Sequence, residues 1–387
     1  MQRVSGKERP HWRELAEQLG FRFHTLNGEP YWDESAYYLF TLKEVEGDLE
    51  APTEEVHELC MDLVSRAVRD EEYLRRLAIP EPYWDYIRRS WLDGQPHLYG
   101  RMDFAYDGSG PAKLYELNYD TPTSLYESAF FQWLWLEQGL AAGTLPAGAD
   151  QFNSIQEALI EAFRQLRERL ARPLYFACVR ESDEDRGTVL YLRDCAAQAS
   201  LETRLISIED IGASIDGRYT DLAHDVIPAI FKLYPWEFMF REDFGPLLPR
   251  ADTYFFEPPW KAILSNKGAL PLLWALHPNH PNLLPAFFEE EPGSVLPPGW
   301  VRKPLFSREG ANVEIHLPDG ARLVEQGPYA DAPLIRQAFH PLPCFDGNYT
   351  LIGSWVIGDR ACGIGLREDR SLITKDTSRF LPHIFVD

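Results

Sequence analysis

The order of three segments near the middle of the chain constrains the fold most. The short apolar run LYFACV (174–179) is followed by a helical stretch from about 184 to 200 and then by TRLISI (203–208). A strand, a helix and a strand in this order are typical of a βαβ unit, whose two strands lie parallel. The sequence therefore predicts a mixed α/β fold that contains a parallel sheet.

Two helices are predicted before this unit. Residues 53–70 place apolar side chains at helical spacing, with Thr53 as a candidate N-cap. Ser154 and Glu157 have the spacing of a capping box, and apolar residues then follow on one face up to Leu170. Arg172-Pro173 is predicted to end this second helix.

Length and charge limit the classes of function. A chain of 387 residues is long enough for two or more domains, and its net charge of −22 disfavours nucleic acid and anionic membranes as partners. Five dispersed cysteines without a C-x-x-C pair argue against a disulfide framework or a zinc knuckle. With neither a signal peptide nor an apolar stretch of membrane-spanning length, we expect a soluble, cytoplasmic protein.

The common catalytic motifs are absent from the sequence. There is no P-loop, no G-x-G-x-x-G that opens a helix after a strand, no G-x-S-x-G and no H-E-x-x-H. The two histidines of HPNH (277–280) lie among prolines and are interpreted as part of a surface loop. Any nucleotide chemistry must therefore use another kind of site.

A predicted hairpin carries the first candidate site. RMDFAY and LYELNYD alternate in polarity on either side of the glycine-rich turn DGSGPAK. Paired as antiparallel strands, they place Asp103, Glu116 and Asn118 on one face, with Arg101 beside Asp103. Two carboxylates and an amide oxygen suit Mg²⁺, although an exposed polar face of a sheet would show the same pattern.

Three later segments add cations. In WVRKPLFSREGANVEI (300–315), Lys303 ends a predicted strand before a loop of small residues. This arrangement can bind nucleotide phosphates, but an ordinary hairpin would show the same pattern. Lys267 lies in SNKGALPLLW (265–274) and is uninformative alone. Arg367 lies in the predicted strand pair 354–378, near Glu368, Asp369 and Asp376. Its guanidinium group could belong to a structural salt-bridge network or could bind a transferred phosphate, and the spacing does not choose between the two.

Together, and in this order, the four segments resemble the glutathionylspermidine synthase family, which are acid–amine ligases of the ATP-grasp type. The likeness is to its short, stand-alone bacterial members without an amidase domain. It runs from YWDESAYY (31–38) to LITKDTSRFLPH (372–383). The resemblance implies an ATP-grasp-like nucleotide-binding sheet with a smaller parallel βαβ (pre-ATP-grasp) lobe.

The resemblance also implies a role for individual residues. Arg101 would contact the γ-phosphate and the acid substrate, and Arg367 would steady charge on the transferred phosphoryl group. Three groups would then hold the ligands: Asp103, Glu116 and Asn118 for Mg²⁺; Lys267, Lys303, Gly310, Ala311, Gln337, Leu372, Ile373 and Thr374 for ATP; and Thr121, Thr123, Glu184 and Asp185 for the acid.

The implied reaction joins a peptide-like acid, such as glutathione, to an amine, such as a polyamine, through an acyl phosphate. Such a reaction needs no protein nucleophile, in keeping with the missing motifs. Two alternatives remain open: a nucleotide-binding regulatory protein that has lost ligase activity, and a hydrolase that uses paired carboxylates.

The expected organisation has three parts. Residues 1–170 supply the metal-binding hairpin (100–120) and helices, residues 171–235 form the βαβ lobe, and residues 236–387 form the nucleotide-binding region. The hairpin is then expected to pack against the last third of the chain. The active site is expected between lobes, where ligand sites commonly lie.

Overall fold

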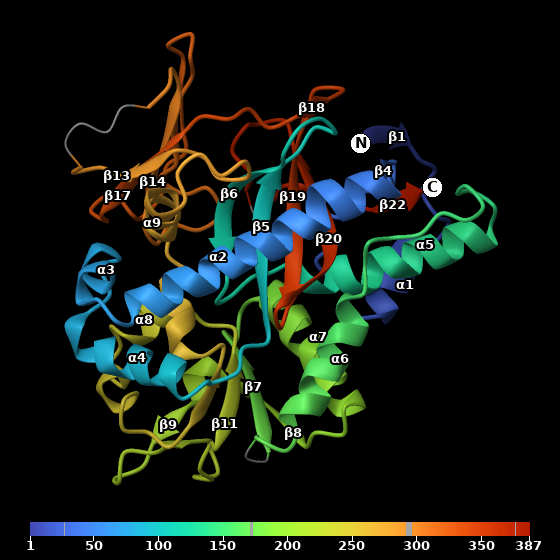
Figure 1. Ribbon diagram of the computed structural model, residues 1–387. Helices are drawn as coiled ribbons and strands as arrows, with labels where there is room; N and C mark the ends of the chain where they lie inside the picture. Colours follow the sequence, from blue (N-terminus) through green and yellow to red (C-terminus); the bar gives the residue numbers. More distant parts are fainter. Residues whose placement is uncertain (27, 171–172, 292–295, 376) are drawn as a thin grey trace.

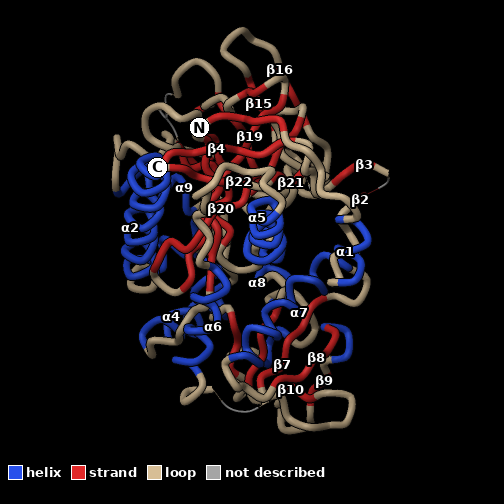
Figure 2. Tube along the Cα trace, turned by 90° about the vertical axis from the view of Figure 1, so that its right-hand side faces the viewer, coloured by secondary structure: helices blue, strands red, loops and turns tan. Residues whose placement is uncertain are grey.

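The computed structural model describes residues 1–26, 28–170, 173–291, 296–375 and 377–387. Its strands form a central sheet, an upper sheet, a parallel sheet at the opposite end and a small sheet at the termini (Figure 1). Two further pairs are β2 (Thr25–Leu26) with β3 (Glu29–Pro30) and β9 (Gly212–Ala213) with β10 (Tyr219–Thr220). Figure 2, turned by 90°, shows the strands of the upper and parallel sheets at opposite ends of the molecule. Among the described residues, no helix is long and apolar enough to cross a membrane.

The central sheet joins distant parts of the chain. Its order is β21-β20-β19-β5-β6, and β18 pairs with β19. Strands β5 and β19 run antiparallel, with Asp103 opposite Gly353, so the early hairpin lies against the last third of the chain as predicted. The strands are β5 (Tyr99–Ala105), β6 (Lys113–Asn118), β18 (Cys344–Phe345), β19 (Asn348–Ile357), β20 (Arg360–Asp369) and β21 (Arg379–Leu381).

The upper sheet brings the lysine-bearing strand to the same region. It is antiparallel where strands pair, in the order β13-β17-β14-β15-β16, and the predicted strand at Lys303 is its central member. Helix α9 (Ala269–Leu276) precedes it. The strands are β13 (Ala286–Phe288), β14 (Trp300–Pro304), β15 (Glu314–His316), β16 (Arg322–Val324) and β17 (Leu334–Ala338).

The predicted βαβ unit is confirmed. Strand β7 (Leu174–Cys178), helix α7 (Asp183–Gln198) and strand β8 (Thr203–Ser207) follow one another, and the two strands are parallel. Strands β11 (Ala229–Lys232) and β12 (Tyr254–Phe256) extend the same parallel sheet. The sheet thus takes a strand from beyond residue 235, where the sequence analysis placed the end of this lobe.

Both predicted helices exist, but their N-terminal caps differ from the prediction. Helix α2 is Ala51–Ala67 and contains Thr53, whose hydroxyl donates to Leu49 O (2.6 Å) and lies 2.7 Å from Ser354 Oγ. Ser154 does precede α6 (Ile155–Leu166), but its hydroxyl donates to Cys362 O (3.2 Å). A partner from the sheet therefore replaces the local capping bond in each case. Helix α6 ends before Leu170, and Arg172 lies outside the described residues.

Helix α2 covers one face of the central sheet (Figure 1). Its buried side chains share one apolar cluster with those of β19 and β20, including Val56, Leu63, Ile352 and Ile364. Periodic apolar residues form this helix because that stripe is removed from water. The remaining helices are α1 (Trp12–Gln18), α3 (Glu71–Arg76), α4 (Trp84–Leu92), α5 (Gln132–Ala141) and α8 (Trp236–Met239), with π-helical turns at Glu44–Glu50 and Glu127–Phe131.

A buried ion pair ties the turn after β6 to the parallel sheet. Lys232 on β11 donates to Asp120 Oδ1 (2.5 Å), and the backbone N–H of Trp236 donates to Asp120 Oδ2 (2.9 Å). Both charged side chains are essentially excluded from solvent. Each charge therefore depends on the other for compensation.

We predict that Lys232→Met lowers the free energy of unfolding by about 3–5 kcal/mol, because it leaves Asp120 buried without a counter-charge. Adding Asp120→Asn should recover part of this loss, since the amide still accepts a bond from Trp236. Urea unfolding of the three proteins measures both effects. Equal stability of Lys232→Met and the wild type would contradict the prediction.

Candidate functional site

The site lies where the central sheet, the upper sheet and the turn after β6 meet. Two cavities adjoin there, one mostly apolar and one mostly polar. They share five wall residues, which are Asp103, Glu116, Gly310, Leu351 and Thr374. Most of the predicted site residues thus come from segments far apart in sequence and line these two adjoining cavities.

The hairpin presents its polar face to this space. Asp103 lies opposite Glu116, and Arg101 lies opposite Asn118, as the alternation predicted. Arg101 Nε donates to Asp103 Oδ1 (2.7 Å), and Asn118 Nδ2 donates to Asp103 Oδ2 (3.1 Å). The predicted metal ligands and Arg101 are therefore a contiguous set on two paired strands.

Cations surround the carboxylate of Glu116. Lys267 Nζ lies 3.4 Å from Glu116 Oε2, and Lys303 on β14 faces the same carboxylate. Although burial would raise the pKa of Glu116, the two lysines and Arg101 lower it to about 2. Glu116 is therefore ionised at neutral pH, which is the form that binds a cation.

Burial affects the neighbouring groups differently. It raises the pKa of Asp103 against the opposing effect of Arg101, and it lowers the pKa of Lys303 to about 8. The set of two carboxylates and one amide fits a hard divalent cation such as Mg²⁺, whose preferred ligands are oxygens. We conclude that the residues present suit this ion.

Both lysines are held by neighbouring backbone or amide oxygens. Lys303 Nζ donates to Gln337 Oε1 (2.9 Å) and to Tyr115 O (3.1 Å), and Lys267 Nζ donates to Ser307 O (2.5 Å). Fixed cations beside an open polar cavity can bind phosphate oxygens with little further ordering.

The apolar cavity continues from the lysines. Its wall contains Gln337 and several apolar side chains, which are Leu284, Val301, Val313, Ile315, Leu342, Leu372 and Ile373. An apolar slot with one amide suits a flat heteroaromatic ring, which needs large contact area and few hydrogen bonds. Of the residues predicted for the nucleotide, Lys303, Gly310, Gln337, Leu372, Ile373 and Thr374 line this cavity, and Lys267 lines the polar one.

The loop after β14 approaches this wall closely. Gly310 has φ +73°, and a Cβ there would lie 2.6 Å from Ile373 Cγ2, so both conformation and space require glycine. Ala311 is next in the loop but lines neither cavity and lies instead against Gly327.

The residues predicted for the acid substrate divide into two groups. Thr121 and Thr123 line the polar cavity together with Arg367, which was predicted to act on the phosphoryl group, and Arg101 Nη1 donates to Thr123 O there (2.8 Å). Glu184 and Asp185 begin helix α7 and do not line the cavity. Arg367 and Thr123 nevertheless interact with Glu184, so this carboxylate adjoins the cavity from the side of the parallel sheet.

The sequence analysis missed several charged groups here, among them Arg308, Asp120 and Glu127. Arg308 bridges two parts of the wall, since it donates to Thr121 Oγ1 (2.8 Å) and Glu237 Oε1 (2.6 Å). Its place in the predicted phosphate-binding loop was the available signal. Asp120 also lines the polar cavity, and Glu127 is fully buried nearby. Glu127 lies in a π-helical turn, whose residue spacing matches neither the α-helical nor the strand period. Sequence periodicity therefore gives no indication of where its side chain points.

Glu127 is a titratable group close to the site. Its Oε1 accepts a hydrogen bond from Tyr31 (2.8 Å), and its electrostatic neighbours include Glu184 and Arg367. Burial, with a further contribution from Glu184, raises the pKa of Glu127 to about 7. Folding therefore favours the protonated form of this carboxyl between its ordinary pKa and neutrality.

We predict that the unfolding free energy of the wild type, relative to Glu127→Gln, falls as the pH rises from about 4.5 to about 7. In this range the unfolded carboxyl ionises and the buried one does not, so the difference amounts to about 3 kcal/mol. Urea unfolding at a series of pH values measures it. Parallel pH profiles for the two proteins would show that Glu127 has an ordinary pKa.

Comparison with known proteins agrees with this arrangement. The family described as "Glutathionylspermidine synthase preATP-grasp" matches residues 3–386. A Haemophilus influenzae protein named "Putative acid–amine ligase" is 40% identical, with all of both chains covered. The Escherichia coli bifunctional glutathionylspermidine synthetase/amidase is 26% identical over 97% of this chain, which spans 63% of that enzyme.

A solved structure shows the same architecture at low identity. The glutathione synthetase-like effector of Globodera pallida superposes with a TM-score of 0.58 at 13% identity, covering 98% of each chain. This likeness concerns the fold alone. On the match over nearly its whole length, the chain belongs to the glutathionylspermidine synthase family, and its mixed α/β fold is of the ATP-grasp type.

Proposed function

We propose that the protein is an ATP- and Mg²⁺-dependent ligase that joins a carboxylic acid to an amine. The observation that carries this proposal is the ionised Glu116 between Asp103, Asn118 and two lysines, at the junction of a polar and an apolar cavity. Carboxylates, cations and an apolar slot are the three environments that a magnesium nucleotide requires. Membership of a ligase family supports the same assignment.

In this proposal each residue group has one task. Asp103, Glu116 and Asn118 would hold Mg²⁺, which when bound neutralises phosphate charge. Lys267 and Lys303 would bind the phosphates, while Gln337 and the apolar wall, including Leu372 and Ile373, would hold the adenine. Gly310 brings the loop backbone close to the nucleotide, and Ala311 would support that loop from outside the cavity.

Two steps account for the reaction. An oxygen of the acid's carboxylate attacks the γ-phosphorus of ATP, the bond to the β-phosphate oxygen breaks, and ADP leaves. The amine nitrogen in its neutral form then attacks the acyl carbon, phosphate leaves with its bonding electrons, and the nitrogen loses one proton to the departing phosphate or to solvent. Arg101 and Arg367 would stabilise charge on the transferred phosphoryl group, and no covalent bond to the protein is needed.

The substrates are proposed as classes. Thr121 and Thr123 suit hydrogen bonding to a peptide-like acid such as glutathione, since both line the polar cavity. Glu184 and Asp185, in the first turn of α7, are proposed to bind the same acid, while the net charge of −22 favours a cationic amine such as a polyamine. The alternative, a nucleotide-binding regulatory protein without ligase activity, would bind the nucleotide but show no amine-dependent turnover. We further propose a cytoplasmic location, since the five cysteines are free thiols.

We predict that Glu116→Gln keeps the fold but lowers amine-dependent ADP release at least about 100-fold, because it removes one charged metal ligand. The measurement is ADP release with panels of acids and amines at saturating Mg²⁺. Glu58→Gln, on the exposed surface of α2, is the matched control. Unchanged turnover in Glu116→Gln would contradict the metal assignment, and absence of turnover in the wild type with every pair would favour the regulatory alternative.

A second prediction concerns salt. The net charge of −22 attracts a cationic amine over a distance, whereas ATP depends on local cations. We therefore expect the KM of the amine to rise steeply between low and physiological ionic strength, with a smaller change in the KM of ATP. Initial-rate measurements across a salt series test this. An amine KM that does not change with salt would contradict it.

A further inference from the structure

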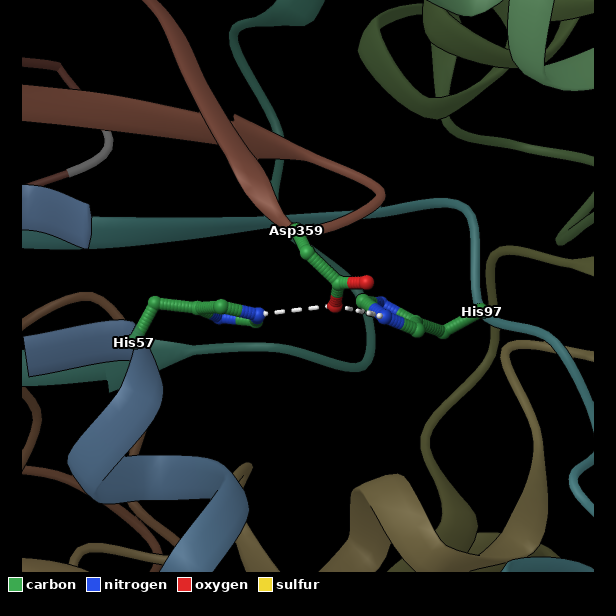
Figure 3. A group of neighbouring side chains, drawn as sticks. All are labelled: His57, His97 and Asp359. Carbon is green, nitrogen blue, oxygen red and sulfur yellow. Dashed lines mark hydrogen bonds and ion pairs between the residues drawn. The ribbon is translucent and has the colours of Figure 1, made fainter.

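Three residues far apart in sequence converge away from the ligase cavity. His57 projects from α2, His97 from the segment before β5, and Asp359 from the turn between β19 and β20 (Figure 3). The three side chains point toward one another. None of them contributes to the two cavities that form the proposed ligase site.

Their distances are those of a metal-ligand set. His57 Nε2 and His97 Nε2 each lie 3.1 Å from Asp359 Oδ1, and all three ligand atoms lie within 4.8 Å of one another. Around a tetrahedral Zn²⁺ with bonds of about 2.0–2.2 Å, neighbouring ligand atoms are separated by about 3.2–3.6 Å. Small side-chain movements would therefore convert the observed triangle into one face of such a site.

The ligand types favour a late first-row metal over the ion of the hairpin site. Two imidazole nitrogens and one carboxylate suit Zn²⁺ and its neighbours, whereas Mg²⁺ prefers oxygen ligands. His57 also has an outer partner, because its Nδ1 lies 2.8 Å from the hydroxyl of Tyr119. That hydroxyl can accept a hydrogen bond from the Nδ1–H of His57, which leaves the Nε2 lone pair available to a metal.

A fourth ligand can reach the cluster from solvent. His97 and Asp359 line an open cavity with Trp91, Trp260 and Arg169, and the Asp359 side chain is 77% exposed. Lys261 does not exclude a metal, because its charge is compensated by Glu257 at 3.0 Å. Arg169 lies in the wall of the same open cavity. Water can therefore complete a four-coordinate site.

We propose that His57, His97 and Asp359 bind one Zn²⁺ ion, or a similar divalent late first-row metal, with water in the fourth position. The ion would join three separate segments at the end of the central sheet. Two of them lead directly into strands of the ligase site, because Tyr99 begins β5 two residues after His97, and β20 starts next to Asp359. The site would fix the end of this sheet.

The competing interpretation is a hydrogen-bonded His–Asp–His group without a metal. In that case each Nε2 carries a proton and donates it to Asp359, and the Tyr119 hydroxyl donates to His57 Nδ1. Both interpretations give each ring nitrogen of His57 a partner. Only a measurement of metal binding therefore distinguishes them.

The experiment is a titration of the chelator-treated full-length protein with Zn²⁺ alone, followed calorimetrically. We expect one equivalent to bind, and we expect Asp359→Asn and His97→Ala each to weaken binding at least about 100-fold, since loss of an outer partner alone costs about 10–100-fold. His280→Ala is the matched control, because His280 pairs with a single carboxylate, Glu55 (3.2 Å). Glu116→Gln should also leave zinc binding unchanged, which separates this site from the proposed ligase site.

A second readout addresses geometry. Co²⁺ in the wild type should give the intense visible absorption of a four-coordinate ion, and Asp359→Asn should lose it. A cooperative melting transition of metal-free Asp359→Asn establishes that the variant is folded, even where the loss of its bonds to the two histidines lowers the midpoint. No zinc binding to the wild type, or equal affinities in Asp359→Asn, His97→Ala and His280→Ala, would overturn the proposal in favour of the metal-free group.

Discussion

The pairing of β5 with β19 is the contact on which the rest of the molecule depends. It places a hairpin from the first third of the chain beside a hairpin from the last, and all seven residues of β5 are buried. Arg101 and Asp103 can be held in this interior only because they neutralise each other and face a polar cavity. A buried charged strand is costly for a structural core, and the proposed binding of charged ligands would account for its presence here.

Cations and carboxylates are balanced in the walls of the central cavities, whereas the chain as a whole is strongly acidic. The chain carries a net charge of −22, yet Lys267, Lys303, Arg101 and Arg367 gather around the hairpin carboxylates. The local cations act over a few ångströms in a partly desolvated space, where electrostatic interactions are strong. The outer acidic field is screened by salt, so the two influences act over different distances.

Regular periodicity allowed much of this fold to be predicted from the sequence. Alternation in RMDFAY and LYELNYD placed Arg101, Asp103, Glu116 and Asn118 on one face, and the structure confirms that placement. The order of strand and helix at 174–208 predicted the parallel pair correctly. Both features depend on residues that are close together in the sequence, so a single sequence is enough to predict them.

What could not be predicted depends on contacts between distant segments. Thr53 and Ser154 match local capping patterns, but each finds a partner in the central sheet. The cluster of His57, His97 and Asp359 spans 302 residues between its outer members, and no spacing rule connects them. The last strand of the parallel sheet, β12, likewise follows a segment of short helical elements and turns, which gives no long periodic signal.

The small sheet at the termini has a consequence for how such a chain can be extended. Strand β4 (Ala36–Thr41) lies between β1 (Gln2–Ser5) and β22 (His383–Val386), so both ends of the chain emerge from one sheet and lie close together in Figure 1. A further domain fused at either end would start from the same place on the surface. Longer architectures can therefore be built on this unit by adding a domain at one attachment point, without rearranging the strands that hold the charged centre.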